Sequence, residues 1–201
     1  MNISSAVKKI LIINIIVFII TLFSKSLILY LGVLPYGNGF MIWQPITAVF
    51  VHSGFGHIFW NMLFLFLVGP MIEIEYFRTA KRFTLYYLAC GVGSSLISNL
   101  INFNGVCIGA SGALFGLLVP LWVGFREIKM SLWGMVEIKI KTLIIILVSI
   151  QILLLLSQGD YSSFAHLSGL FVGIIIIYFY RKGTFQKNKG KQEITDHSSM
   201  L

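Results

Sequence analysis

Six long apolar segments constrain what this chain can fold into. They cover roughly residues 9–24, 56–73, 83–101, 109–125, 142–157 and 162–180. Hydrophobic residues make up 57% of the 201 positions and charged residues only 11%, against about 25% in soluble domains. One soluble core cannot hide so much apolar surface, so lipid is the expected solvent. Because a spanning segment must satisfy its own backbone groups, each segment is predicted to be a helix.

The segments therefore predict an all-α membrane protein with six transmembrane helices. We expect residues 1–183 to form one membrane domain and residues 184–201 to form a polar, basic, disordered tail. The first segment is expected to remain as a span, because no small-residue cleavage site follows Phe23. The two cysteines, Cys90 and Cys107, set no disulfide framework and are expected to act as small apolar residues.

The basic residues predict how the chain is oriented. The net charge is +8, and all of the 15 Lys and Arg residues except Lys25 fall at alternate junctions between the apolar segments. The clusters are at 8–9, 78–82, 126–141 and 181–191. This is the positive-inside pattern, and it places both termini in the cytoplasm of a bacterial-type plasma membrane. It argues against a nucleic-acid partner, because membrane orientation accounts for the distribution of the positive charge.

Two loops between the segments contain too many apolar residues to be fully exposed to water. The outer loop at 25–55 contains the apolar run 27–31 and two interface anchors, Tyr30 and Trp43. The inner loop at 126–141 mixes charge with Met130, Leu132, Trp133 and Met135. Both loops are expected to lie at a membrane surface.

Four polar side chains interrupt the apolar segments near the outer face. His57 lies at the outer end of the second segment, and Asn61 follows one turn deeper on the same helix face. Ser111 begins the fourth segment. His166 lies about four residues into the sixth, roughly 6 Å deep at 1.5 Å per residue. Polar groups in membrane spans usually face the bundle interior or a wet cavity, so these four are expected to share one layer.

Serine and histidine at one membrane depth suggest hydrolysis inside the bilayer. A serine hydroxyl needs a base to become a nucleophile, and imidazole suits that role at neutral pH. His57, the Asn61 amide and the backbone N–H of Ser111 are candidate donors to a developing oxyanion. No acidic residue lies at this depth within the segments, although Asp160 lies in the adjoining outer loop. The economical prediction is a dyad of serine and histidine.

Small residues recur at intervals of four beside both members of this dyad. They are Gly112 and Gly116 in the fourth segment, and Ala165, Gly169 and Gly173 in the sixth. Stripes of this kind let membrane helices approach closely. If the two stripes face each other, they bring His166 to Ser111.

Each feature alone also has a structural interpretation. A serine between glycines caps or packs a helix, a lone histidine is a satisfied polar group, and His57 with Asn61 forms an interhelical hydrogen-bonded pair. The combination at one depth favours catalysis. A small transporter is a competing function, but it predicts charged or broken helices, and no Asp, Glu, Lys or Arg lies deep in a segment.

The ordered motifs of the chain resemble those of the rhomboid family of intramembrane serine proteases. They are His52-x4-His57-x3-Asn61, Gly109-Ala110-Ser111-Gly112 and Ala165-His166-x2-Gly169-x3-Gly173. Gly69 and Glu73, at the inner end of the second segment, also fit. The resemblance covers roughly residues 9–180 and implies a six-helix rhomboid-like bundle that works without a cofactor or metal ion.

The resemblance also implies a role for each motif residue. Ser111 is the implied nucleophile and His166 the general base and then acid. His57 and Asn61 stabilise the oxyanion together with the Ser111 N–H, and His52 is a structural residue on the outer face. Further supporting residues are Gly109, Gly112, Phe115 and Gly169. The implied substrates are transmembrane proteins in the lipid bilayer, cut near the outer membrane face after lateral access past the fifth helix.

Two positions depart from the residues that many rhomboids carry. Phe115 stands one turn after the serine, where members often stack an aromatic ring on the catalytic histidine, and it lacks the hydroxyl of those with Tyr. Gln44 follows Trp43 where many members have Arg, which affects hydrogen bonding of the first loop rather than the chemistry. The alternative function is a rhomboid-like pseudoprotease that binds membrane helices without cutting them; retention of both Ser111 and His166 favours the protease.

Overall fold

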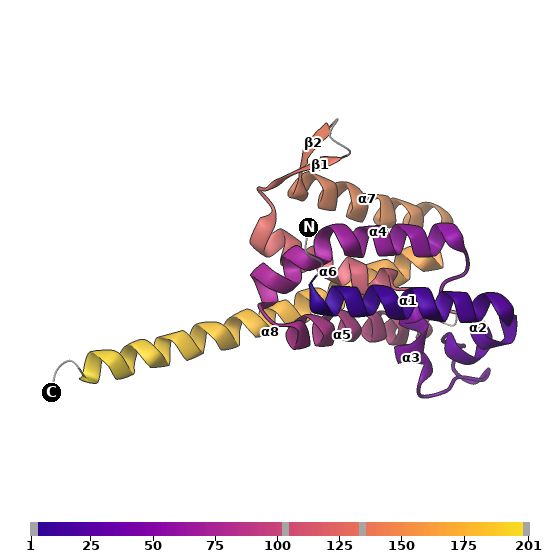
Figure 1. Ribbon diagram of the computed structural model, residues 1–201, viewed down its shortest axis with the longest axis horizontal. Coiled ribbons are helices and arrows are strands. Elements are labelled where there is room, and N and C mark those ends of the chain that lie inside the picture. The colour runs from indigo at the N-terminus through magenta and orange to yellow at the C-terminus, as the bar shows by residue number, and fades with distance from the viewer. Residues whose placement is uncertain (1–3, 102–104, 133–135, 199–201) are drawn as a thin grey trace.

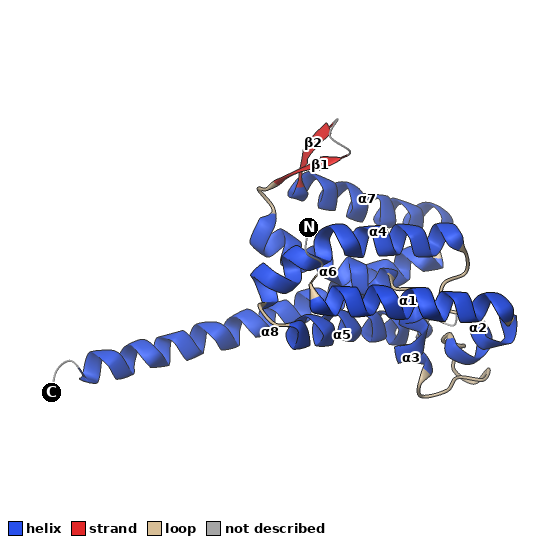
Figure 2. Ribbon diagram, viewed as in Figure 1, coloured by secondary structure: helices blue, strands red, loops and turns tan. Residues whose placement is uncertain are grey.

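The structure is a computed structural model that describes residues 4–101, 105–132 and 136–198. Side chains are described up to Lys182, except those of residues 131–136. The described chain is mostly helical, with one small pair of strands (Figure 2). Its elements are α1 (Ser5–Phe23), α2 (Lys25–Leu31), α3 (Gln44–Thr47), the 3-10 turn η1 (Ala48–Phe50), α4 (Phe55–Met71), the π-helical η2 (Ile72–Phe77), α5 (Ala80–Asn99), α6 (Ser111–Phe125), β1 (Lys129–Leu132), β2 (Val136–Lys139), α7 (Ile140–Gln158) and α8 (Tyr161–Ser198).

All six apolar segments form helices, as the sequence predicts. In chain order they are α1, α4, α5, α6, α7 and α8, and they pack as a bundle (Figure 1). Four stretches are long and apolar enough to cross a membrane: Ser5–Phe23, Phe55–Phe77, Ile140–Gln158 and Tyr161–Lys182. The shorter α6 has 15 residues, and α5 carries Lys81 and Arg82 in its first turn. The four long apolar helices mark the chain as an integral membrane protein.

Helix α6 forms the centre of the bundle. It packs most extensively against α8 and α5, and it also contacts α7 and α4. Its side chains at Leu117, Leu118 and Leu121 are almost fully buried. Because its first residue is Ser111, this central position puts the candidate nucleophile among the surrounding helices.

A buried carboxylate holds the beginning of α1 against the end of α4. Glu73, on η2, accepts hydrogen bonds from the backbone N–H groups of Ala6 and Val7 at 3.0–3.2 Å. A negative charge at a helix N-terminus is favourable, because the first N–H groups have no acceptor within the helix. Gly69 adds close packing, since a Cβ there would lie 2.8 Å from a methyl group of Val7. Glu73 and Gly69 therefore both hold the end of this helix against the beginning of α1.

Gln44 organises the connection at 25–55 between α1 and α4. Its side chain is fully buried, and its Oε1 accepts from the N–H groups of Leu34 and Met41 at 3.2 and 3.0 Å. Its Nε2 donates to the Leu29 carbonyl at 3.3 Å. The amide therefore ties together three parts of the loop without the positive charge of an arginine. The two predicted anchors also touch, because Trp43 Nε1 donates to the Tyr30 carbonyl at 3.1 Å.

The connection between α6 and α7 contains a β-hairpin that the all-α prediction missed. Strands β1 and β2 pair antiparallel, with Lys129 opposite Lys139 and Leu132 opposite Val136. Polar and apolar residues alternate along both strands, which is the period of a half-exposed strand rather than a helix. On the exposed side, Glu127 forms ion pairs with Lys139 and Lys141 at 3.1–3.3 Å. The predicted interfacial residues Trp133 and Met135 lie outside the described residues.

Helix α8 runs past the bundle in one line (Figure 1). Its backbone stays helical to Ser198, beyond the membrane-length part that ends at Lys182. This helix differs from the irregular backbone expected after residue 183. The boundary between a domain at 1–183 and a disordered tail at 184–201 stays a prediction.

Candidate active site

A glycine turn leads directly into Ser111, the first residue of α6. Gly109 has a φ of 119°, which residues with a Cβ rarely adopt, and its N–H donates to the Ala48 carbonyl at 2.9 Å. A Cβ at Gly109 would also lie 2.7 Å from Nε2 of His57. Glycine is therefore required twice, for the backbone angle and for the approach of the histidine. The first N–H groups of α6 follow at once, and a helix N-terminus favours an anion.

His166 reaches the same place from α8. Its ring stacks on Phe115, with centroids 4.6 Å apart and planes 3° from parallel. Phe115 lies one turn after Ser111 on α6, so the stack holds the imidazole beside the first turn of that helix. This ring contact is the one that the rhomboid resemblance implied. On its other side, Nδ1 of His166 lies 2.7 Å from Oε1 of Gln151 on α7.

The two glycine stripes face each other, as the sequence predicts. A Cβ at Gly169 of α8 would collide with the backbone carbonyl of Gly112 on α6. One turn further, a Cβ at Gly173 would lie 3.0 Å from the carbonyl oxygen of Gly116. The helices thus meet backbone to backbone along two turns. Residues with larger side chains would push α8, and the histidine on it, away from α6.

His57 projects toward the serine from the first turn of α4. The backbone N–H of Ser53 lies 3.4 Å from its Nδ1, and the Ser53 hydroxyl lies 3.1 Å from the same atom. A backbone N–H only donates, so Nδ1 acts as the acceptor and the proton of the neutral ring is on Nε2. That Nε2 is the atom beside Gly109. The ring therefore presents an N–H donor toward the turn that carries the nucleophile.

Asn61 is one turn deeper on α4 and is buried. Its amide Nδ2 has no hydrogen-bond partner among the described residues. A buried N–H group without a partner is costly, so it is available to an acceptor that arrives with a substrate. His52 supports this face from the segment before α4. It is only 1% exposed, and its ring meets that of His57 edge to face, with centroids 4.9 Å apart.

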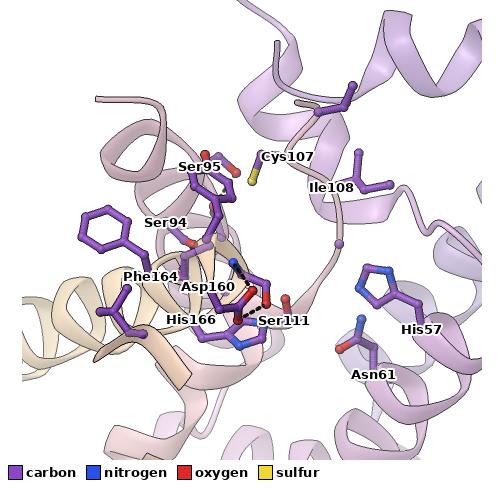
Figure 3. Close-up of a pocket in the computed structure, with 18 of the residues that line it drawn as sticks. His57, Asn61, Ser94, Ser95, Cys107, Ile108, Ser111, Asp160, Phe164 and His166 are labelled. Atoms are coloured by element: carbon purple, nitrogen blue, oxygen red, sulfur yellow. Dashed lines mark hydrogen bonds between the residues drawn. The ribbon is translucent and has the colours of Figure 1, made fainter. Parts of the chain in front are cut away.

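A cavity of about 1020 Å³ joins these residues. Figure 3 shows the side chains of His57 and Asn61 on one side of it and those of Ser111 and His166 on the other. All four line the cavity, so the shared depth predicted from the sequence corresponds to one shared space. Its wall includes polar side chains such as Ser94 as well as apolar ones. Such a cavity has room for water and for a peptide segment.

Ser111 and His166 line the cavity together but are not hydrogen-bonded to each other in this conformation. Among the described side-chain hydrogen bonds, His166 is joined only to Gln151, and Ser111 Oγ to none. Catalytic hydrogen bonds are often long in the free enzyme and shorten when substrate binds. The unbound geometry therefore fits a dyad that closes on a substrate.

Asp160 lies near the site but does not contact His166. Its carboxylate accepts from the N–H and hydroxyl groups of Ser162 and Ser163 at 2.6–3.4 Å, and so caps α8. These hydrogen bonds, from Ser162 first and then Ser163, hold the pKa of Asp160 below its ordinary value. The group beside the histidine is instead the amide of Gln151, which the sequence analysis did not single out. The available signal was a lone amide within an otherwise apolar segment.

Cys107 also lines the cavity and brings a thiol to its wall. Burial raises the pKa of its thiol above the ordinary value of 9.0. The thiolate is the reactive form of cysteine, so this residue stays protonated and unreactive at neutral pH. Its backbone instead pairs with Val33 of the outer loop.

Comparison with known proteins places this arrangement in a family. Residues 39–183 match the family described as Rhomboid domain. The chain belongs to the rhomboid family. It is 34% identical over 142 residues to RHOMBOID-like protein 1 of Arabidopsis thaliana, covering 69% of this chain and 34% of that protein. Rhomboid-like protein 11, chloroplastic, of the same plant is 33% identical over 177 residues, covering 79% of this chain and 57% of its own length.

A relative named as a protease is also similar. Rhomboid-like protease 1 of Toxoplasma gondii is 30% identical over 149 residues, covering 70% of this chain and 48% of that protein. This chain therefore spans only about a third to three fifths of the length of these curated relatives. The region that matches the family, residues 39–183, contains His57, Asn61, Ser111 and His166.

Proposed function

We propose that this protein is an intramembrane serine endopeptidase that cuts transmembrane substrates near the outer membrane face. The observation that carries the proposal is the single cavity lined by a serine, two histidines and an asparagine from three different helices. Membership of the rhomboid family supports the same activity, since a named relative is a protease. The six-helix bundle would cross the membrane six times, with α5 and α6 enclosed by the four longer apolar helices.

The proposed reaction begins at the hydroxyl of Ser111. Its oxygen attacks the carbonyl carbon of the scissile peptide while the hydroxyl proton moves to Nε2 of His166. The resulting imidazolium then gives this proton to the leaving amine, and an acyl-enzyme remains on the serine. A water molecule from the cavity attacks the acyl group, with the histidine acting again as base and then as acid. Serine and histidine return to their starting states.

The oxyanion formed in each step needs fixed hydrogen-bond donors. The Nε2–H of His57, the free Nδ2–H of Asn61 and the backbone N–H of Ser111 would supply them. These donors are held in a buried site, where they act more strongly than in water. The N-terminus of α6 adds its partial positive charge. His52, Gly109, Gly112, Phe115 and Gly169 would support this geometry through the contacts described above.

Lateral access from lipid suits a transmembrane substrate. A second, apolar cavity of about 350 Å³ lies between α4, α6 and α7 and extends to Ser111. Its wall includes Phe64 and Leu67 of α4 and Leu143 and Leu147 of α7. An apolar substrate helix entering between α4 and α7 would remain in a lipid-like environment until its scissile bond reached the polar cavity.

The orientation of the chain is part of the proposal. Positive charge at alternate junctions supports cytoplasmic termini and an outward-facing site. The named relatives come from a plant and a parasite, so a bacterial-type plasma membrane remains a prediction from the sequence. The competing function is a pseudoprotease that binds membrane helices without cutting them. Presence of the complete set of polar cavity residues favours the protease.

The test is proteolysis in liposomes with a generic single-span substrate. We expect the unmodified protein to cut it, and Ser111→Ala and His166→Ala each to abolish cleavage while the protein still inserts and folds. The two losses should not add, because the residues act as one unit. Ser157→Ala is the matched control, since this exposed hydroxyl bonds only to the Leu153 carbonyl of its own helix. Wild-type turnover by Ser111→Ala would refute the dyad, and binding without cleavage by the unmodified protein would identify a pseudoprotease.

A further inference from the structure

A single amide interrupts the apolar outer half of α7. From residue 143 to residue 156, Ser149 and Gln151 are the only polar residues of this helix. The neighbours of the amide, Ile150 and Ile152, are each 44% exposed on the outside of the bundle, where lipid would lie. A polar amide within a membrane span is costly unless it is hydrogen-bonded, so such a residue usually has a functional partner.

The partner of Gln151 is His166. The distance from Gln151 Oε1 to His166 Nδ1 is 2.7 Å, the shortest side-chain contact the histidine makes to a polar group among the described residues. An amide oxygen only accepts, so Nδ1 must carry the proton in this contact. A neutral imidazole has one ring proton, which leaves the lone pair of Nε2 free to act as the base.

Stacking alone does not decide which nitrogen faces the serine. Contact with Phe115 fixes the plane of the His166 ring, but a ring turned over in the same plane would stack equally well. A directional hydrogen bond to one nitrogen removes this ambiguity. Asp160 does not supply it in this structure, because its carboxylate accepts from Ser162 and Ser163 and no described hydrogen bond joins it to His166.

We infer that Gln151 is a positioning residue for the proposed protease: its side-chain oxygen holds the proton on His166 Nδ1 and directs Nε2 toward Ser111. The inference rests on the proposed function. During acylation the serine proton moves to Nε2 of His166. The Gln151 amide neither loses nor gains a proton. The Nδ1–H···O bond becomes charge-assisted when the ring is an imidazolium, so it strengthens as the transition state forms.

The position of Gln151 also makes this bond depend on α7. The buried residues of α7, Ile140 and Ile144, lie at its inner beginning, and its main packing partner is α8. Further out, the amide is the described polar link between the two helices. Displacement of the outer half of α7 would therefore remove the acceptor from the histidine as well as widen the access route.

The experiment compares three variants in the full-length protein. Gln151→Leu keeps the approximate size of the side chain and removes the acceptor, whereas Gln151→Glu keeps an acceptor and adds negative charge. Ile152→Ala is the matched control, because it shortens the neighbouring side chain on the exposed face. Two assays are used. The first measures kcat and KM for the transmembrane substrate, and the second measures the rate at which a small fluorophosphonate labels Ser111, which does not depend on passage of a substrate helix.

We expect Gln151→Leu to lower kcat and the labelling rate by about 10–100-fold, the effect of losing one charge-assisted hydrogen bond, with KM nearly unchanged. The acidic limb of the pH–rate profile should move to lower pH in Gln151→Leu, because the imidazolium loses an acceptor. It should move to higher pH in Gln151→Glu, because a carboxylate favours the imidazolium. The other titratable groups facing His166 are His57 on α4 and Asp160 before α8, and all variants retain them. Ile152→Ala should match the unmodified protein.

Two results would overturn the inference. One is that Gln151→Leu has the same kcat and the same labelling rate as Ile152→Ala. The other is that the acidic limb of the pH–rate profile lies at the same pH in Gln151→Leu and Gln151→Glu. If the amide had only a structural role, the Leu and Glu substitutions would not move the acidic limb in opposite directions. If Gln151→Leu does not fold, the limb of Gln151→Glu decides alone. An unmodified protein that neither cleaves nor labels would instead refute the proposed function, and this outcome is distinct because it precedes any substitution.

Discussion

Replacing Gly169 by alanine tests whether the close approach of α6 and α8 is what aligns the dyad. A Cβ at this position would lie 2.7 Å from the carbonyl carbon and 2.9 Å from the Cα of Gly112, and it would overlap the carbonyl oxygen. All three atoms belong to the backbone of a central helix, so no side chain can rotate out of the way. Ordinary contact begins near 3.4 Å, so the helices must separate by at least about 0.7 Å.

This separation affects both stability and rate. Forcing an extra carbon into a well-packed interior costs about 1–3 kcal/mol. The shift also moves His166, which lies one turn before Gly169, and a misplacement of ~1 Å can cost on the order of a hundredfold in rate. Gly173→Ala should be milder, because its Cβ would lie 3.0 and 3.1 Å from the backbone of Gly116, and the one closer atom is the hydroxyl of Tyr86. Valine in place of Gly112, Gly116 or Gly169 should lower activity more than alanine at the same position, because its side chain is larger.

The assay measures thermal unfolding and cleavage for each variant in the same liposomes. Gly54→Ala is the control, because a Cβ there meets no atom within 4 Å. From the most to the least active, the expected order is Gly54→Ala, Gly173→Ala and Gly169→Ala. Equal stability and equal turnover in Gly169→Ala and Gly54→Ala would refute the packing argument, because the added carbon would have displaced nothing that catalysis needs.

Three further predictions concern the oxyanion donors, the cap of α8 and the topology. Asn61→Ala should lower kcat without abolishing it: one lost donor costs roughly 2.7–4 kcal/mol in a soluble protease, and the remaining donors compensate in part. An unchanged kcat in folded protein would contradict this role. Asp160→Ala should lower stability by about 1 kcal/mol at neutral pH, as lost caps do. The pKa of Asp160 is held below 3.8, so this contribution is present above that range and is lost as the pH falls through the folded-state pKa; thermal scans of the two proteins should converge in acid. In a cysteine-free background, a membrane-impermeant thiol reagent should label Cys at Gly105 in intact cells but not Cys at Gly190, and the reverse pattern would place the site on the cytoplasmic face.

The helices and the depth of the polar residues could be predicted because both depend on local sequence. Lipid requires each apolar segment to be a helix, and the rise per residue then fixes how deep Ser111 and His166 lie. The stripe of Gly169 and Gly173 predicted its contact with α6 for a related reason, since only small residues permit such an approach. The roles of the cavity residues stay predictions until activity is measured.

The hairpin was missed although its signal was present. Residues 129–132 and 136–139 alternate polar and apolar side chains, but each run has only four residues. So short an alternation is weak evidence beside the long apolar segments, and the charges in it fit an interfacial loop equally well. The structure adds the antiparallel pairing of Lys129 with Lys139, a contact across the turn that no single run can reveal.

Asp160 is the acidic residue nearest to His166 in the sequence, but no described hydrogen bond joins the two, and the hydrogen bonds of Asp160 explain why. Asp160 is six residues away, but hydroxyl and N–H groups two and three residues after it take up its carboxylate, as short polar side chains often do at helix starts. Helices α7 and α8 are antiparallel neighbours that meet at Gly159, whose φ of 61° closes the first of them. In such a pair, residues equally far from the turn lie side by side, and Gln151 and His166 stand eight residues before and seven after Gly159. Two polar residues at matched distances from a tight turn between apolar helices therefore predict a hydrogen bond, whatever their separation in the sequence.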